Sequence, residues 1–180
     1  MKKTYVITIS LSFTLFIISL IKLRGTFGHF LLSNGPSLPI YLPTIILFIL
    51  YNLYRKIKLK KSFFTKINHI FLNIFIVFTL NFLSYYPGMI IGKNDIDKTK
   101  IFCEKLIPKI EQYKIEKGTY PYKINDVSNY IEPPFYIRRI LGNQYYSHTT
   151  NYYRFDFMDP RGIMTIWGYD KEKMKWYTYD

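Results

Sequence analysis

The chain has 180 residues, of which 49% are hydrophobic, and it carries a formal net charge of +13. This charge is uneven, because the first ninety residues hold ten basic residues and no Asp or Glu, whereas the second ninety hold all twelve acids. Basic residues placed between apolar runs are typical of membrane topology signals, so the charge argues against nucleic acid as a partner.

Three runs without any charged residue dominate the first half. They cover residues 5–21, 37–54 and 67–86, which is 17, 18 and 20 residues. Because a bilayer core needs about 20 apolar residues, with a range of roughly 17–25, the pattern predicts three transmembrane helices in a membrane region of residues 1–89. A cleavable signal peptide is the alternative for the first run, but no small-residue cleavage site precedes Lys22.

The loop between the second and third runs predicts the orientation. It is rich in basic residues, which favour the cytoplasmic side together with the N-terminus. Three crossings then place everything after Gly88 outside the cytoplasm, so we expect a multi-pass protein of the inner (cytoplasmic) membrane with a periplasmic C-terminal domain. The residues that carry this signal are Arg55, Lys56, Lys58, Lys60, Lys61 and Lys66.

Several polar side chains fall inside the predicted spans. Amides in such positions typically hydrogen-bond between helices, and the spans hold no carboxylate, Lys or Arg that would mark an ion or proton pathway. The sequence therefore favours helix packing over transport. The polar residues are Asn52, Asn68, His69, Asn73 and Asn81.

A one-sided helix is predicted after the third span, which Pro87-Gly88 would close. Asp95 can cap the start of this helix, Pro108 is expected to kink it, and Gly118 fits the left-handed position after its end. The buried face steps by three and four residues along the chain. Its members are Ile96, Thr99, Phe102, Cys103, Leu106, Ile107, Ile110 and Tyr113.

The remaining residues predict a short helix or turn at 125–131, stopped by Glu132-Pro133-Pro134, and then three antiparallel strands. Alternation predicts strands at 153–157, 163–169 and 174–179, with a turn at 159–162. In the first strand Arg154 and Asp156 lie on the face opposite the aromatic residues, and in the last strand either Trp176 and Thr178 or Tyr177 and Tyr179 turn inward. The predicted fold class is thus a membrane all-α region of three transmembrane helices followed by an α+β domain, residues 93–180, in which the amphipathic helix packs on an antiparallel β-meander.

The order of these elements resembles the soluble domain of type II secretion pseudopilins and type IV pilin-like proteins, over about residues 95–180. The matching residues are Tyr113, Lys114, Gly118, Tyr120 and Pro121. The resemblance implies a pilin-like, non-catalytic domain. In that family a glycine cleavage site precedes a single N-terminal apolar helix, which carries a Glu near its start. This chain has neither the glycine nor the Glu, and three predicted spans precede its domain, so filament assembly is not implied.

No motif for catalysis, phosphate binding or zinc binding occurs, so we expect no enzyme, no cofactor and no small-molecule substrate. Cys103 lies on the apolar stripe, which predicts a buried structural thiol, and His148, Ser128 and Ser147 have no partner spacing typical of a site. Three carboxylates have two alternative roles, since they could bind calcium or could stabilise turns. These are Asp156, Asp159 and Asp170.

Tyrosines crowd the second half, and the loop 142–151 is predicted to expose an interaction patch of Tyr145, Tyr146 and His148. We therefore expect a binding protein whose partners are the lipid bilayer and another envelope protein, accessory to a secretion or pilus-type system. The alternative is an immunity protein that binds a toxin in the periplasm. A third hypothesis, a membrane enzyme or transporter, would require a functional role for His69 and the Asn residues of the spans.

Overall fold

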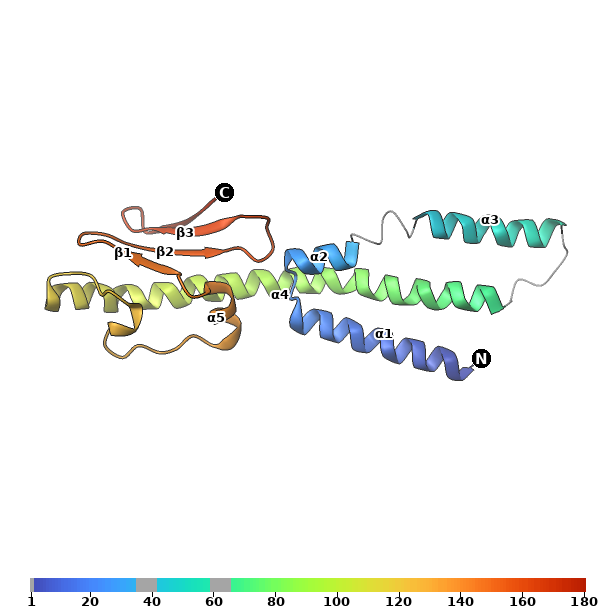
Figure 1. Cartoon of the computed structure of the whole chain (residues 1–180), viewed down its shortest axis with the longest axis horizontal. Helices are drawn as coiled ribbons and strands as arrows, with labels where there is room; N and C mark the ends of the chain where they lie inside the picture. The colour runs from blue at the N-terminus through green and yellow to red at the C-terminus, as the bar shows by residue number, and fades with distance from the viewer. Residues whose placement is uncertain (1, 35–41, 59–65) are drawn as a thin grey trace. The chain divides into compact units, whose positions relative to one another are not determined.

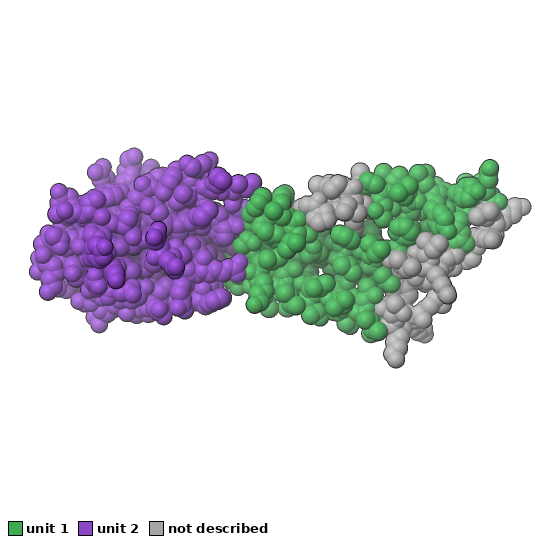
Figure 2. Space-filling view, in the orientation of Figure 1, with its two compact units in different colours: residues 1–91 green, residues 92–180 purple. Residues whose placement is uncertain are grey.

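A computed structural model describes residues 2–34, 42–58 and 66–180 of the chain. The chain divides into two compact units, residues 1–91 and residues 92–180 (Figure 2). The first unit contains α1 (Lys2–Lys22), α2 (Phe27–Asn34), α3 (Leu42–Lys58) and the beginning of α4 (Lys66–Lys117). Helix α4 is 52 residues long and contributes residues to both units (Figure 1).

The prediction of three transmembrane helices is wrong. Among the described residues, one helix is long and apolar enough to cross a membrane, the part of α4 from Phe71 onward, and the apolar helix Val6–Lys22 is shorter. Helix α3 has 17 residues and ends in Arg55, Lys56 and Lys58, while residues 37–41 of the predicted second span lie outside the described residues. A charge-free run sets the local hydropathy, but it does not fix where a helix begins or ends.

The third predicted span does not end at Pro87-Gly88, because α4 continues through both residues to Lys117. A proline inside a helix removes one backbone hydrogen bond, which a long helix survives. Asp95 is therefore not a helix cap. It is buried within α4, and its backbone carbonyl accepts a hydrogen bond of 2.7 Å from the Thr99 hydroxyl.

The second unit packs one helix against an antiparallel sheet. After α4 come a 3-10 helix η2 (Ile124–Asp126), α5 (Phe135–Leu141) and the strands β1 (Tyr146–His148), β2 (Tyr153–Met158), β3 (Ile166–Asp170) and β4 (Lys175–Tyr179). The four strands lie in the order β1-β2-β3-β4, so the predicted three-stranded meander gains a further strand. The Asp159 turn forms as predicted, since the Gly162 N–H donates to the Asp159 carbonyl at 3.2 Å.

Two elements were not predicted, α5 and β1. Pro133-Pro134 was interpreted as a stop, but Pro134 is the N-cap of α5 and Gly142 ends that helix with φ 65. Proline is favoured at a helix start because its missing N–H has no partner there. Strand β1 has three residues and gains its structure from pairing with β2, which local sequence does not show.

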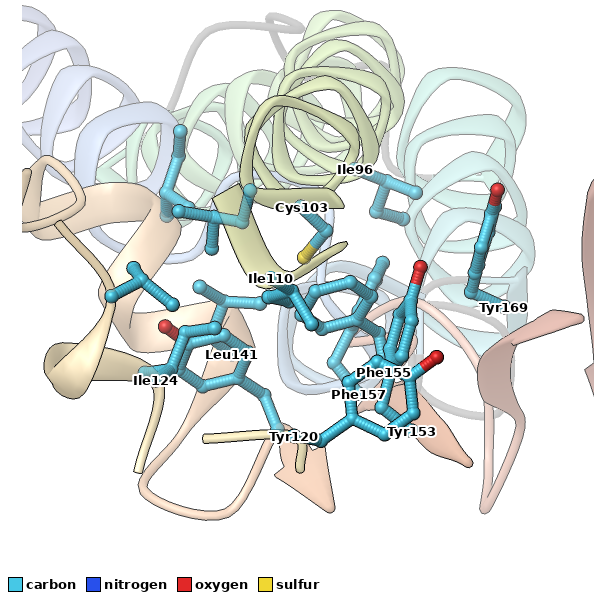
Figure 3. Packing of buried hydrophobic residues seen from close by; sticks show 14 residues of the cluster. Ile96, Cys103, Ile110, Tyr120, Ile124, Leu141, Tyr153, Phe155, Phe157 and Tyr169 are labelled. Carbon is cyan, nitrogen blue, oxygen red and sulfur yellow. The ribbon is translucent and has the colours of Figure 1, made fainter. Parts of the chain in front are cut away.

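The core lies between α4 and the inner face of the sheet (Figure 3). The predicted helix face is confirmed, because all eight of its members are buried or partly buried. The sheet contributes alternate residues of its strands, as expected when one face is covered. The buried cluster from the sheet and from α5 includes Ile137, Leu141, Tyr153, Phe155, Phe157 and Tyr169.

Gly118 ends α4 in the predicted left-handed conformation, with φ 80 and its N–H donating to the Lys114 carbonyl at 2.8 Å. Since a Cβ is disfavoured in that conformation, Gly118→Ala should lower the free energy of unfolding by about 1 kcal/mol. Gly118→Asn should cost less, because asparagine visits this region more readily. Urea unfolding of the full chain in detergent, followed by tryptophan emission, measures both, and equal losses would contradict the conformational explanation.

Candidate interaction surface on the sheet

The face of the sheet turned away from α4 carries a cluster of charged and aromatic side chains. Arg154 and Asp156 come from β2, and Tyr177 and Tyr179 come from β4, each alternating with a residue on the inner face. Arg154 Nε donates to Asp156 Oδ1 at 2.7 Å, and the Tyr179 hydroxyl donates to the same oxygen at 2.9 Å. We call these four residues the outer cluster.

Gly168 of β3 lies beneath the outer cluster and allows it to form. A Cβ at this position would lie 3.0 Å from both Tyr177 Cζ and Tyr179 Cε1, and 3.1 Å from Asp156 Oδ1. The two tyrosine rings therefore fold over the glycine, with their centroids 5.7 Å apart. A glycine inside a strand commonly marks such a close approach.

The Arg154 guanidinium also lies over the tyrosine rings, 4.8 Å from the Tyr179 centroid and 5.9 Å from the Tyr177 centroid. Burial, and then the hydrogen bond to Asp156, raise the pKa of the Tyr179 hydroxyl above its ordinary value. Cation–π contacts and the shared carboxylate hold these side chains in one geometry before any partner arrives. The rim is apolar and partly exposed, with Tyr152, Met158 and Ile166.

Such a surface is suited to protein recognition. Tyrosine and arginine are enriched among the residues that dominate binding energy, and rings already fixed in place lose little entropy on binding. Strand alternation predicted Arg154 and Asp156 on the outer face, but it left open which residues of the last strand turn inward. The structure decides between the two orientations, because Trp176 packs on Phe157 and Tyr169 of the core, so Tyr177 and Tyr179 face outward.

The predicted patch of Tyr145, Tyr146 and His148 is not an exposed surface. Tyr145 is only 8% exposed, and its hydroxyl lies 3.3 Å from that of Tyr130. Tyr146 is partly buried and donates its hydroxyl to the Pro121 carbonyl at 3.1 Å, while its ring stacks on His148. Burial is the main reason that the pKa values of Tyr145 and Tyr146 are raised. These tyrosines fill the core because β1 pairs with β2.

The residues of the resemblance motif have structural positions. Tyr113 packs at the edge of the core, and Tyr120 and Pro121 are buried. The Lys171 ammonium donates to the Tyr120 hydroxyl and lies 2.9 Å from Glu111 Oε1, which ties the end of β3 to α4. Burial alone would lower the pKa of Lys171, but the bonds to Tyr120 and Glu111 raise it.

The three carboxylates considered for calcium are all engaged within the domain. Asp156 accepts from Arg154 and Tyr179, and Asp159 from Arg161 and the Trp167 indole. Asp170 accepts the backbone N–H groups of the following turn. In the part of the chain that the structure describes, no three His, Cys, Asp or Glu side chains gather in a group that would hold a metal ion.

Cys103 lies fully buried in the core (Figure 3). Burial, and then the nearby Glu104 charge, raise the pKa of its thiol, so a reactive thiolate is disfavoured. His148 contacts the rings of Tyr122 and Tyr146. The surroundings of Cys103 and His148 are therefore those of residues that serve in packing.

The first unit contains a buried histidine that no sequence pattern had indicated. His29 Nδ1 accepts the Gly25 N–H at 3.1 Å, so the ring proton sits on Nε2 and is donated to Ser84 Oγ at 2.8 Å. The serine hydroxyl in turn donates to the Asn81 carbonyl at 2.6 Å. This tautomer is the reverse of a serine–histidine nucleophile pair, in which the ring accepts the serine proton. The network therefore fastens α2 to α4.

The topology signals lie at the ends of two helices. Arg55, Lys56 and Lys58 form the last turn of α3, and Lys66 is the first residue of α4. Lys60 and Lys61 lie outside the described residues. Of the predicted interhelical amides, Asn81 donates to the Leu32 carbonyl of α2 at 3.0 Å, whereas Asn52 donates within its own helix to the Phe48 carbonyl.

Comparison with known protein families, with curated proteins and with solved structures gave no match for this chain.

Proposed function

We propose that the protein is a membrane-anchored binding protein whose second unit, residues 92–180, recognises another envelope protein through the outer cluster. The outer cluster is the observation that carries this proposal, because it combines an ion pair with two tyrosines that are fixed before binding. The pilin-like resemblance and the link to a secretion or pilus-type system remain predictions.

Anchoring rests on α4. Its apolar stretch from Phe71 is long and apolar enough for a membrane helix, and only 11% of the most apolar 18 residues is buried inside the protein. Residues 55–66 before it are rich in lysine and arginine, which favours their location in the cytoplasm. A single crossing of the inner membrane by α4 would then place the second unit outside the cytoplasm. This is the side of the membrane that the sequence predicts for the C-terminal domain.

Site-specific photo-crosslinking in cells tests this function. A benzophenone amino acid replaces Tyr177 in the outer cluster, or Tyr122, an exposed tyrosine outside the cluster, as the matched control. We expect a discrete crosslinked protein from position 177 that is absent from position 122. In that background Arg154→Ala should weaken the crosslink strongly, since truncating a dominant interface residue costs about 2 kcal/mol or more.

Two results would contradict the proposal. One is equal crosslinking from both positions or none from position 177. The other is an alkaline phosphatase fusion at Asp180 that stays inactive while a fluorescent protein fused there is bright, which would place the second unit in the cytoplasm. The identity of a crosslinked partner separates a secretion component from a toxin.

A further inference from the structure

The loop between β2 and β3, residues 159–165, ends in two exposed apolar side chains that the binding function above does not use. Ile163 is 64% and Met164 is 72% exposed. Met164 adopts φ 62, a left-handed conformation that is unusual for a residue with a side chain. We call residues 159–165 the tip loop.

The base of the tip loop is rigid although its end is exposed. Arg161 donates to Asp159 through its backbone N–H at 2.9 Å, through Nε at 3.1 Å and through Nη2 at 2.8 Å. The Trp167 indole donates to Asp159 Oδ2 at 3.1 Å, and the Asp159 N–H donates to the Thr165 carbonyl at 2.8 Å. The braced base thus holds two adjacent apolar side chains in solvent, where they can enter an apolar environment.

Contacts within the second unit show which end of the sheet carries the tip loop. The Lys100 ammonium lies 3.0 Å from the centroid of the Trp167 ring, next to the tip loop, whereas Lys171, at the other end of β3, pairs with Glu111. Strand β3 therefore runs beside α4 from the level of residue 100 to that of residue 111. Ile163 and Met164 precede Trp167 in the chain, so they lie at the end of the sheet that is nearer to residues 92–100.

That end is the one closest in sequence to the apolar part of α4. Lys93 is the first charged residue after the apolar stretch, and Lys100 lies seven positions after it. In a helix this separation corresponds to a rise of about 10 Å, which is comparable to the depth of a headgroup layer. Residues 92–100 and the tip loop hold four basic (Lys93, Lys98, Lys100, Arg161) and three acidic residues (Asp95, Asp97, Asp159). Asp180 adds a fourth acidic residue, because it follows Tyr179, which pairs with Ile166, so the charges at this end of the sheet balance.

We propose that the tip loop rests on the membrane surface, with Ile163 and Met164 inserted at the boundary between headgroups and acyl chains. This inference rests on the anchoring by α4 proposed above. Apolar side chains near Arg and Lys suit this boundary, because the apolar groups enter it while the charges stay at the headgroups. The contact would fix how the second unit is oriented on its anchor, and with it the direction in which the outer cluster faces.

The test uses the full chain reconstituted in phosphatidylethanolamine–phosphatidylglycerol vesicles, with an environment-sensitive fluorophore on Ile163→Cys or, as the control, on Met174→Cys. Met174 is 81% exposed in the β3–β4 turn at the opposite end of the sheet, and the native Cys103 is buried. We expect the label at 163 to be quenched by nitroxide-bearing lipids and shielded several-fold from aqueous iodide. The label at 174 should show the reverse.

Flotation of the same vesicles separates this inference from the proposed function. Protein that floats with the vesicles, but whose label at 163 is as accessible to iodide as the label at 174, overturns the tip-loop contact and leaves anchoring intact. Protein that does not float overturns both.

Discussion

Phe155→Ala should lower the free energy of unfolding of the second unit by about 4 kcal/mol, since deleting a buried phenylalanine ring removes its burial energy and leaves a cavity. Phe155 is 0% exposed and packs against the rings of Tyr145, Tyr146, Tyr153 and Tyr169. Because these are large rings held by strand pairing, the surroundings can fill little of the space. Urea unfolding of the full chain in detergent, monitored by the emission of Trp167 and Trp176, measures the change.

The matched control is Phe135→Ala, the same chemical change at the start of α5. Phe135 is 76% exposed, so its loss should stay within about 0.5 kcal/mol. If both variants lost the same stability, the core assigned between α4 and the sheet would be wrong.

The second large effect is expected at Asp159, whose carboxylate lies at the base of the tip loop. Its side chain is 8% exposed, that of Arg161 is 28% exposed, and their atoms Oδ2 and Nη2 are 2.8 Å apart. Asp159→Ala removes the carboxylate that accepts hydrogen bonds from this guanidinium and from the Trp167 N–H, so it should cost about 3 kcal/mol in the free energy of unfolding. Glu132→Ala, at an exposed ion pair with Arg138, should cost less than about 1 kcal/mol.

This effect should depend on pH. Burial alone would raise the pKa of Asp159, but hydrogen bonds from Arg161 and Trp167 bring it below its ordinary value. Since the folded pKa is depressed, the carboxylate stabilises the fold fully above the unfolded pKa of about 3.9 and loses this effect as the pH falls through the folded value. The difference between wild type and Asp159→Ala should be constant near neutral pH and shrink in acid. A difference that grew in acid would sink the assignment.

The second unit was largely predictable because local patterns determine it. The three- and four-residue spacing from Ile96 to Tyr113 matches the face that α4 buries, and Gly118 ends the helix where its φ requires. The unpredicted elements depend on distant residues. Tyr145 becomes buried because its carbonyl accepts the Asp156 N–H at 2.9 Å and its ring contacts Phe155. Its neighbours in the sequence are polar, so the local sequence does not indicate that this side chain is buried.

The membrane half was predicted less well, since hydropathy reports which residues avoid water but not how a helix continues. Helix α4 passes Pro87 and Gly88, and the same Gly88 packs against the Gly25 backbone and the His29 ring, where a Cβ would collide with both. Only part of the outer cluster could be predicted from the sequence. Alternation placed Arg154 outward, but only the pairing of β3 with β4 brings Tyr179 to Asp156.

The sequential strand order β1-β2-β3-β4 also bears on how the domain is made. Each strand pairs with the strand synthesised just before it, so no strand waits for a distant partner, and the loops that must close are short. As the chain emerges, α4 comes first and presents its apolar face, and the sheet can then grow along it one hairpin at a time. Such a domain should fold quickly and expose few unpaired strands to aggregation during synthesis.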